Sequence, residues 1–195
     1  MALRNTSESW GWLARLLHWA MALMILFLLG VGFYMVEVLG EDSDSLMQRY
    51  ELTQVHKSWG VTVFALACLR VIWRFVNPTP ALPDNMGSLE RTLAHGGHIA
   101  LYLCMFAMPL TGWLLASSSP FNDADAYFQI KNMVFGLFEL PDPYPKGDEA
   151  TTKFWSRIHF YVGLALTLVL VGHALAALKH HFVNRDNVLR RMTRG

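Results

Sequence analysis

Two histidines near the end of the chain, His159 and His173, have the type and spacing that most directly suggest chemistry. They lie fourteen residues apart in one apolar segment. In an α-helix each residue turns about 100° and rises about 1.5 Å, so fourteen steps end about 40° short of four turns and about 21 Å along the axis. Both imidazoles therefore leave the same helix face. Such a helix can supply one ligand to each of two metal centres if neighbouring helices bring the opposite ligands.

These histidines belong to one of four long apolar stretches. The 195 residues are 53% hydrophobic and 16% charged, with a mean hydropathy of +0.29, which is too apolar for an ordinary soluble domain. Each stretch is long enough to cross a hydrocarbon core of about 30 Å. We therefore predict an all-α integral membrane protein, a four-helix bundle in the lipid bilayer. Its helices are expected at about residues 12–36, 54–76, 93–117 and 157–178.

The connections between the predicted helices contain no separate soluble domain, so we interpret residues 1–195 as one transmembrane domain. The longest connection, residues 118–156, is expected to lie over the outer mouth of the bundle and to carry a short helix around residues 123–138. The first apolar run is too long for a signal peptide and is expected to be retained. Cys68 and Cys104 fall inside predicted helices, which argues against a disulfide or a cysteine-based metal site.

Charged residues are distributed unequally between the two ends of the predicted bundle. The end with both termini and the second connection carries ten of the sixteen basic residues and four of the fifteen acidic ones, a net charge of +6. The opposite end has a net charge of −5. Because positively charged loops stay in the cytoplasm, we predict that both termini are cytoplasmic. We expect no nucleic-acid partner.

Four histidines within the predicted helices form two pairs of matched depth. His18 lies six residues inside the first helix, and His173 lies six residues before Lys179 at the same face. His56 and His159 each lie about two residues inside the opposite face. Neutral imidazole binds iron without adding charge to a low-dielectric site, so these pairs suit two haem irons. Taken singly, each histidine also fits a hydrogen-bonded packing role, but four at paired depths are hard to explain in that way.

The neighbours of the outer histidines favour a flat, bulky cofactor over a bare ion. Gly60 and Gly163 follow His56 and His159 by four residues, so each lies on the ligand face, where the lack of a side chain lets a porphyrin approach the backbone. Glycine at such faces also permits close packing of transmembrane helices. The helices carry no Asp or Glu well inside the membrane core, which argues against a di-iron carboxylate or hydrolytic zinc site.

Further histidines lie at the cytoplasmic end. His95 and His98 begin the third helix, and they either replace His18 as the inner ligand or line a quinone or propionate pocket. We favour the pocket for His98 and an interfacial position for His95. His180 and His181 end the fourth helix, where we expect a solvated helix terminus.

Basic residues flank both predicted sites. Arg70 and Arg74 lie one turn apart at the cytoplasmic end of the second helix, and either anchor it at the lipid headgroups or pair with propionates of the inner haem; both roles are compatible. Lys57, Lys153 and Arg157 flank the outer histidine pair. They are either a local positive patch that attracts a small anion or scattered interfacial residues.

Several short stretches carry a likeness that extends over nearly the whole chain. They are His18-Trp19, His56-Lys57-Ser58-Trp59-Gly60, Arg70-Val71-Ile72-Trp73-Arg74 followed by Pro78 and Pro80, Ala94-His95-Gly96-Gly97-His98, the His159/His173 pair, and Phe135-Gly136-Leu137-Phe138-Glu139-Leu140-Pro141. Together they closely resemble the bacterial cytochrome b561 family. The resemblance implies a dihaem b protein of the bacterial inner membrane, related to the cytochrome subunits of nickel-iron hydrogenase and formate dehydrogenase. It also implies that the axial ligands are His18, His56, His159 and His173.

The resemblance further implies electron exchange with the ubiquinone pool, and one member type oxidises superoxide at the outer face while reducing ubiquinone. We therefore expect a membrane electron-transfer protein with two haems b, ubiquinone as substrate and a periplasmic redox partner, and, as a sharper version, a superoxide:ubiquinone oxidoreductase. The acidic outer face argues against efficient attraction of superoxide. An alternative is a membrane-anchor cytochrome subunit that passes electrons for a partner dehydrogenase or periplasmic protein. A proton or metal-ion transporter is disfavoured, because the core lacks acidic residues and broken helices.

Overall fold

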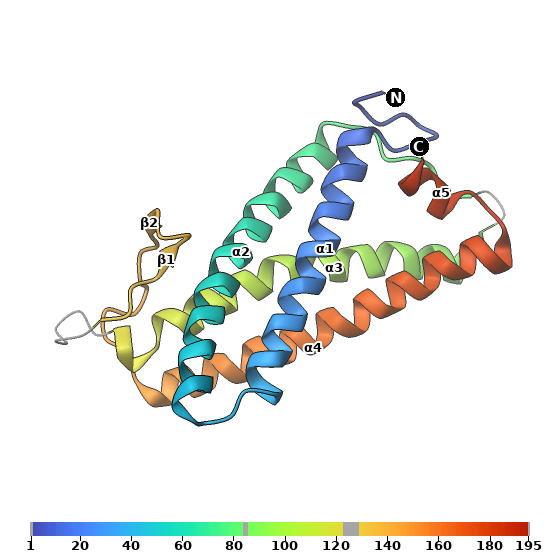
Figure 1. The fold of residues 1–195 in the computed structure, drawn as a ribbon. Coiled ribbons are helices and arrows are strands. Elements are labelled where there is room, and N and C mark those ends of the chain that lie inside the picture. The colour runs from blue at the N-terminus through green and yellow to red at the C-terminus, as the bar shows by residue number, and fades with distance from the viewer. Residues whose placement is uncertain (1, 84–85, 123–128, 195) are drawn as a thin grey trace.

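The computed structural model describes residues 2–83, 86–122 and 129–194, which form four long helices and several short elements (Figure 1). The long helices are α1 (Trp12–Glu37), α2 (Ser43–Phe75), α3 (Ser88–Ser117) and α4 (Glu149–Lys179). The short elements are the 3₁₀ turn η1 (Pro120–Asn122), strands β1 (Met133–Val134) and β2 (Phe138–Glu139), the π-helical turn η2 (His180–Asn184) and α5 (Val188–Thr193). The four long helices are long and apolar enough to cross a membrane, which confirms the predicted all-α membrane fold.

Two of the helices begin well before the apolar stretches that the sequence pattern identifies. Helix α2 begins eleven residues earlier than expected and α4 begins eight residues earlier. Both starts are capped by aspartate: Asp42 accepts from the Ser45 amide at 3.0 Å, and Asp148 accepts from the Thr151 amide at 2.9 Å. An aspartate in this position satisfies an amide that has no partner within the helix. Hydropathy marks only the apolar part of a helix, so it does not detect these polar first turns.

The long helices pack as two antiparallel pairs that cross each other (Figure 1). Helix α1 packs along α2 and α3 along α4, while α2 also packs against α3. Within the described ranges, α4 is not a close-packed neighbour of α1 or α2. The buried apolar core takes residues from all four helices: Met21, Ile25, Val63, Ala67, Met105 and Leu166.

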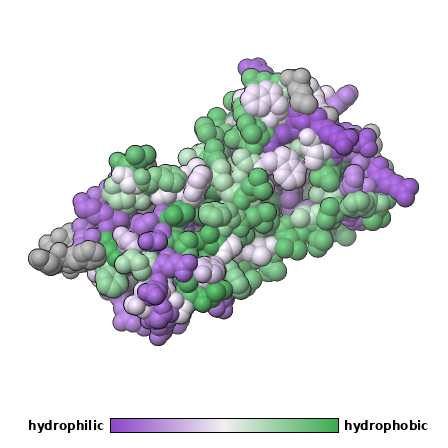
Figure 2. Space-filling view, in the orientation of Figure 1, coloured by the Kyte–Doolittle hydropathy of each residue, from purple (hydrophilic) through white to green (hydrophobic). Residues whose placement is uncertain are grey.

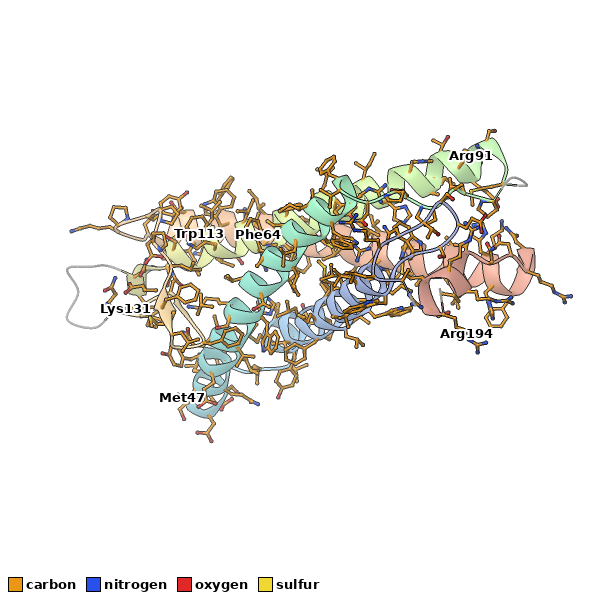
Figure 3. The ribbon with its side chains drawn as sticks, turned by 90° about the horizontal axis from the view of Figure 1, so that it is seen from above. Met47, Phe64, Arg91, Trp113, Lys131 and Arg194 are labelled. Atoms are coloured by element: carbon orange, nitrogen blue, oxygen red, sulfur yellow. The ribbon has the colours of Figure 1, made fainter. Side chains whose placement is uncertain are left out.

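The outside of the bundle is apolar in its middle and polar at its ends. Figure 2 shows this apolar band on the visible face, with hydrophilic residues gathered at both ends. Leu23 on α1 is 67% exposed and Leu168 on α4 is 66% exposed, and side chains of this kind are stable when they face lipid rather than water. Figure 3 places Arg194 at one end of the molecule and Lys131 at the other.

The end of the chain folds back against the start of α1. The Trp19 indole donates from Nε1 to the carbonyl oxygen of Met192 at 3.0 Å. Arg15 donates from Nη1 to the carbonyl oxygen of Thr193 at 3.3 Å. The first and last helices are therefore tied together at the end of the bundle that holds both termini.

The outer connection contains a hairpin where the sequence analysis predicts a short helix. Residues 123–128 of that helix lie outside the described residues, but residues 129–138 include β1, which pairs antiparallel with β2, so the prediction is wrong there. Phe135 and Gly136 adopt left-handed conformations, with φ of 49° and 69°, and the amide of Leu137 donates to the carbonyl oxygen of Val134 at 2.9 Å. Successive residues with positive φ close a tight hairpin turn and cannot continue a right-handed helix.

Candidate functional site

The four histidines of the predicted pairs meet as two pairs, one toward each end of the bundle. The ring centroids of His18 on α1 and His173 on α4 lie 6.1 Å apart. Those of His56 on α2 and His159 on α4 lie 6.3 Å apart. Helix α4 contributes to both pairs because its two histidines share one face. In the described part of the chain, the backbones of the helices that carry each pair are not closely packed, so the facing imidazoles meet across a wider separation.

Both separations suit one iron atom held between two imidazoles. A metal–nitrogen bond is about 2.0 Å long, and an imidazole nitrogen lies about 1.1 Å from its ring centroid, so a linear pair has centroids about 6.2 Å apart. His98 also faces His173, with centroids 5.4 Å apart. That separation is shorter than a linear pair needs, so His18 fits better as the ligand opposite His173. His98 then lies beside the inner pair, where the pocket interpretation puts it.

Threonine and glycine residues from neighbouring helices enclose the outer pair. The hydroxyl of Thr111 on α3 lies 3.0 Å from Nδ1 of His159. A Cβ atom at Gly112 would lie 3.1 Å from Cε1 of the same ring, and one at Gly32 on α1 would lie 3.5 Å from Cε1 of His56. The buried Nδ1 of His56 has no hydrogen-bond partner among the described residues.

Arginine and tyrosine side chains surround the inner pair. Nη2 of Arg70 lies 3.1 Å from Nδ1 of His18, and Nε of Arg70 donates to the Tyr102 hydroxyl at 3.3 Å. The guanidinium carbon of Arg74 lies 5.9 Å from the centroid of the Tyr102 ring. Positive charge is thus concentrated beside the inner pair, where guanidinium groups suit carboxylates such as haem propionates.

The two glycines that the sequence analysis selected have different surroundings. A Cβ atom at Gly60 would meet no atom within 4 Å, so close packing against a neighbouring helix does not explain this glycine, and the position leaves room for a flat cofactor. Gly163 lies against Met108, whose Cε would be 3.6 Å from an added Cβ atom. Close packing of α3 and α4 is therefore the better explanation for Gly163.

Two of the three outer basic residues are engaged with other side chains. Lys57 donates from Nζ to Oδ1 of Asn132 at 2.9 Å, and Lys153 lies 2.5 Å from a carboxylate oxygen of Glu149. Arg157 is exposed on α4. Glu149 offsets the charge of Lys153, whereas the neutral Asn132 amide holds Lys57 in place without removing its charge.

The remaining histidines lie at the end of the molecule that holds the termini. His95 is exposed, and its Nδ1 lies 2.7 Å from the carbonyl oxygen of Arg91; its interfacial position stays a prediction. His180, expected at a solvated helix end, is instead buried and lies 2.5 Å from a carboxylate oxygen of Asp186. The reason is that η2 and the left-handed Arg185, with φ of 53°, turn the chain back over this ring.

The sequence analysis did not identify several residues of the two sites. Thr111 is a polar residue and Gly112 a small one in an otherwise apolar helix. This pattern would have suggested a site on α3 if the packing of α3 against α4 had been known. Tyr102 and Gly32 have no distinguishing sequence pattern, because their roles depend on how the two helix pairs cross.

The donor set fits haem b better than a bare metal ion. No group of three or more His, Cys, Asp or Glu side chains suited to a metal ion occurs within residues 2–83, 86–122 and 129–194. Each site instead offers two opposed imidazoles. Two protein ligands are sufficient when the cofactor itself supplies the other four, as a porphyrin does. The open space beside Gly60 and the wide separation of α4 from α1 and α2 are suited to a flat ring system.

Comparison with known proteins gives one family match and several related sequences. A family model described as prokaryotic cytochrome b561 matches residues 9–195. The chain is 29% identical to cytochrome b561 homolog 2 of Escherichia coli strain K12, over 98% of this chain and 95% of that protein. It is 27% identical to the probable superoxide oxidase CybB of Yersinia pestis, over 90% of each chain. It is 24% identical to cytochrome b561 homolog 1 of Escherichia coli strain K12, over 90% of this chain and 92% of that protein.

Proposed function

The chain belongs to the prokaryotic cytochrome b561 family of membrane electron-transfer proteins, and on that premise we propose that it holds two haems b and exchanges electrons between a periplasmic partner and the ubiquinone pool. It is a multi-pass protein of the bacterial inner membrane. Membership of the family implies that the protein binds haem b. What we propose beyond this is the number of haems, their ligands, the quinone and the periplasmic partner.

The observation that carries the proposal is the pair of histidine separations. Ring centroids 6.1 Å apart for His18 and His173, and 6.3 Å apart for His56 and His159, both match the spacing that two imidazoles need to share one iron. Because His159 and His173 stand on one continuous helix, the distance between the two sites is fixed by about 21 Å of α-helical rise.

The residues of the chain determine how each haem is held. When bound, haem b supplies a reversible one-electron couple at each site. The histidines provide neutral ligands, and the apolar helix faces exclude water. Arg70 and Arg74 lie where they can pair with the propionates of the inner haem. The net charges of +6 and −5 at the two ends support an inner site on the cytoplasmic side.

A haem assay of ligand variants tests the proposal. The difference between reduced and oxidised spectra, with a pyridine haemochrome assay, should give two b-type haems per chain. His159→Ala and His173→Ala should each leave one haem. His98→Ala is the matched control and should retain two, because its ring is too close to His173 for a linear pair. If either ligand variant keeps two haems, the ligand assignment is wrong.

Superoxide is the candidate substrate at the outer face, because a relative is named a probable superoxide oxidase. Removal of charge at Lys57, Lys153 and Arg157 should slow reduction of the haems by superoxide by about 2–5-fold at low salt, and high salt should diminish the difference. Arg157→Gln should contribute more than Lys153→Gln, since the carboxylate of Glu149 already offsets the charge of Lys153. Rates that do not change with salt would exclude electrostatic attraction by these residues.

A further inference from the structure

We propose that Thr111 and Gly112 on α3 are positioning residues that hold the His159 imidazole in one tautomer and one orientation, with the proton on Nδ1 and the lone pair on Nε2 available to the outer iron. The inference rests on the proposed dihaem function. It assigns to α3, a helix that carries none of the four ligands, control over one ligand of the outer haem.

The tautomer follows from the hydrogen bonds of the Thr111 hydroxyl. Its oxygen lies 2.8 Å from the carbonyl oxygen of Ala107, 3.0 Å from that of Met108 and 3.0 Å from Nδ1 of His159. A hydroxyl has one proton, and carbonyl oxygens only accept. The hydroxyl therefore donates its single proton to the two carbonyl oxygens in a shared hydrogen bond. Its own oxygen accepts a hydrogen bond from His159. Nδ1 of His159 must carry a hydrogen, which leaves the lone pair on Nε2.

The opposite tautomer would be unfavourable at this position. If the hydroxyl donated to an unprotonated Nδ1, its oxygen lone pairs would face two carbonyl oxygens at 2.8 and 3.0 Å with no hydrogen between them. Thr111 is only 8% exposed, so water is poorly placed to relieve that repulsion. Hydrogen bonds to the backbone of α3 thus determine the direction of the Thr111 hydroxyl, and the hydroxyl in turn determines the tautomer of the His159 imidazole.

Gly112 restricts the orientation of the same ring. A Cβ atom at this position would lie 3.1 Å from Cε1 and 3.5 Å from Nδ1 of His159. A side chain at position 112 would therefore crowd the edge of the imidazole, and the ring would have to shift by a few tenths of an ångström to make room for it. Thr111 binds Nδ1, and position 112 leaves space for the adjacent Cε1, so the two residues together favour this orientation of the ring.

Two of the other three proposed ligands, His56 and His18, lack this kind of support in the part of the chain that the structure describes. Nδ1 of His56, opposite His159, has no partner among the described residues, and Nδ1 of His18 faces the guanidinium of Arg70. A hydrogen bond from Nδ1 makes an imidazole a stronger electron donor to its metal, which favours the ferric state. The Thr111 contact should therefore lower the potential of the outer haem and leave the inner haem unaffected.

Redox titration of Thr111 variants tests the proposal. Thr111→Val keeps the shape of the side chain and removes the acceptor. We expect this variant to bind haem and to show an upward shift in the midpoint potential of one haem, with the other unchanged. Thr111→Ser retains the hydroxyl and should restore the original potential. Thr167→Val is a matched control on α4, because among the described residues the Thr167 hydroxyl donates to its own helix alone, at the carbonyl oxygen of Gly163, 2.8 Å away.

Electron paramagnetic resonance of Gly112→Ala examines the orientation separately. The added methyl group should tilt the His159 ring and change the g values of one low-spin ferric haem while the other signal stays the same. Gly30→Ala on α1 is its control, because Gly30 is exposed and an added Cβ there meets no protein atom within 4 Å.

The outcomes separate this inference from the function on which it rests. A wild-type protein without two haems would overturn the proposed function. Two haems with unchanged potentials in Thr111→Val would overturn the role of Thr111 alone, and so would a shift of both potentials or failure of Thr111→Ser to restore the original value. If Thr111→Val loses the outer haem, rescue of haem content by Thr111→Ser supports the inference and absence of rescue contradicts it.

Discussion

At the scale of single residues, the contact between Arg70 and His18 has a chemical consequence for the inner site. A guanidinium only donates, so the 3.1 Å contact makes Nδ1 of His18 the acceptor. An imidazole that binds iron through Nε2 instead carries its proton on Nδ1. The two arrangements exclude each other. If His18 held iron through Nε2, as proposed, Arg70 would be released from His18, and its guanidinium would remain beside Tyr102, where it could pair with a propionate.

If the inner histidine pair holds a haem, as proposed, the charge of Arg70 should also influence its midpoint potential. Reduction adds an electron, so a nearby positive charge stabilises the reduced state. A unit charge within about 7 Å is worth about 1–2 kcal/mol at an effective dielectric constant of about 20–40. Arg70→Gln should thus lower the inner midpoint potential by about 50–100 mV in a spectroelectrochemical titration. Arg194→Gln removes the same charge from the exposed C-terminal end and should change neither potential. A fall of both potentials in Arg70→Gln would contradict a local effect.

The histidine pairs could be predicted from sequence because only two regularities determine them. Helical periodicity places His159 and His173 on one face, and membrane depth selects their partners. Thr111 and Gly112 could not be assigned in this way. Their roles depend on which face of α3 meets α4, and that face is set by the packing of the complete bundle.

At the scale of the elements, the aspartate caps explain why α2 and α4 extend beyond the membrane core. Asp148 accepts from the Thr151 hydroxyl at 2.7 Å and from the Thr151 amide at 2.9 Å. These hydrogen bonds hold the pKa of Asp148 below its ordinary value of 3.8. A lowered pKa means that the folded protein favours the ionised carboxylate. The stabilisation is therefore complete above about pH 5 and is lost as the pH falls through the lowered pKa.

Thermal unfolding in detergent tests the Asp148 cap. Asp148→Ala should lower the midpoint of unfolding at pH 7, and the difference from wild type should shrink at pH 3 and below. Asp148→Asn keeps an acceptor oxygen without a charge, so its stability relative to Asp148→Ala should be independent of pH. A difference between wild type and Asp148→Ala that is equally large at both pH values would exclude the ionised cap as its source.

The outer hairpin shows where element prediction failed. The sequence analysis predicts a short helix around residues 123–138, but in the described part of this range Phe135-Gly136 forms a left-handed turn and directs the chain back on itself. Phe135 occupies the first position of the turn, where left-handed turns usually have Asn, Asp or Gly. The sequence therefore gives little indication of a turn at this point. The long helices were easier to predict, because about twenty consecutive apolar residues have few other stable structures.

At the scale of the whole molecule, the charge difference between the two ends implies an orientation. The end with the termini carries the excess of arginine, and the hairpin end carries the excess of acidic residues. Positively charged segments are retained in the cytoplasm. We therefore expect the hairpin to face the periplasm, with the outer histidine pair nearer to it.

Cysteine labelling of intact cells tests this orientation. Lys131→Cys should react with a membrane-impermeant maleimide, whereas Arg194→Cys should react only after the membrane is opened. The two positions lie at opposite ends of the molecule (Figure 3), and the native Cys68 and Cys104 are replaced by serine or alanine to remove their background. Labelling of Arg194→Cys in intact cells would contradict this orientation, because it would show that the termini face the periplasm.

The hydrogen bonds between α1 and α5 set an order for assembly during synthesis. Trp19 and Arg15 donate to the carbonyl oxygens of Met192 and Thr193, which follow all four long helices in the chain. The first helix is therefore synthesised long before these acceptors exist. His18 is the immediate neighbour of Trp19, so the contacts beside the inner histidine pair can form only after the last of the four long helices has been made.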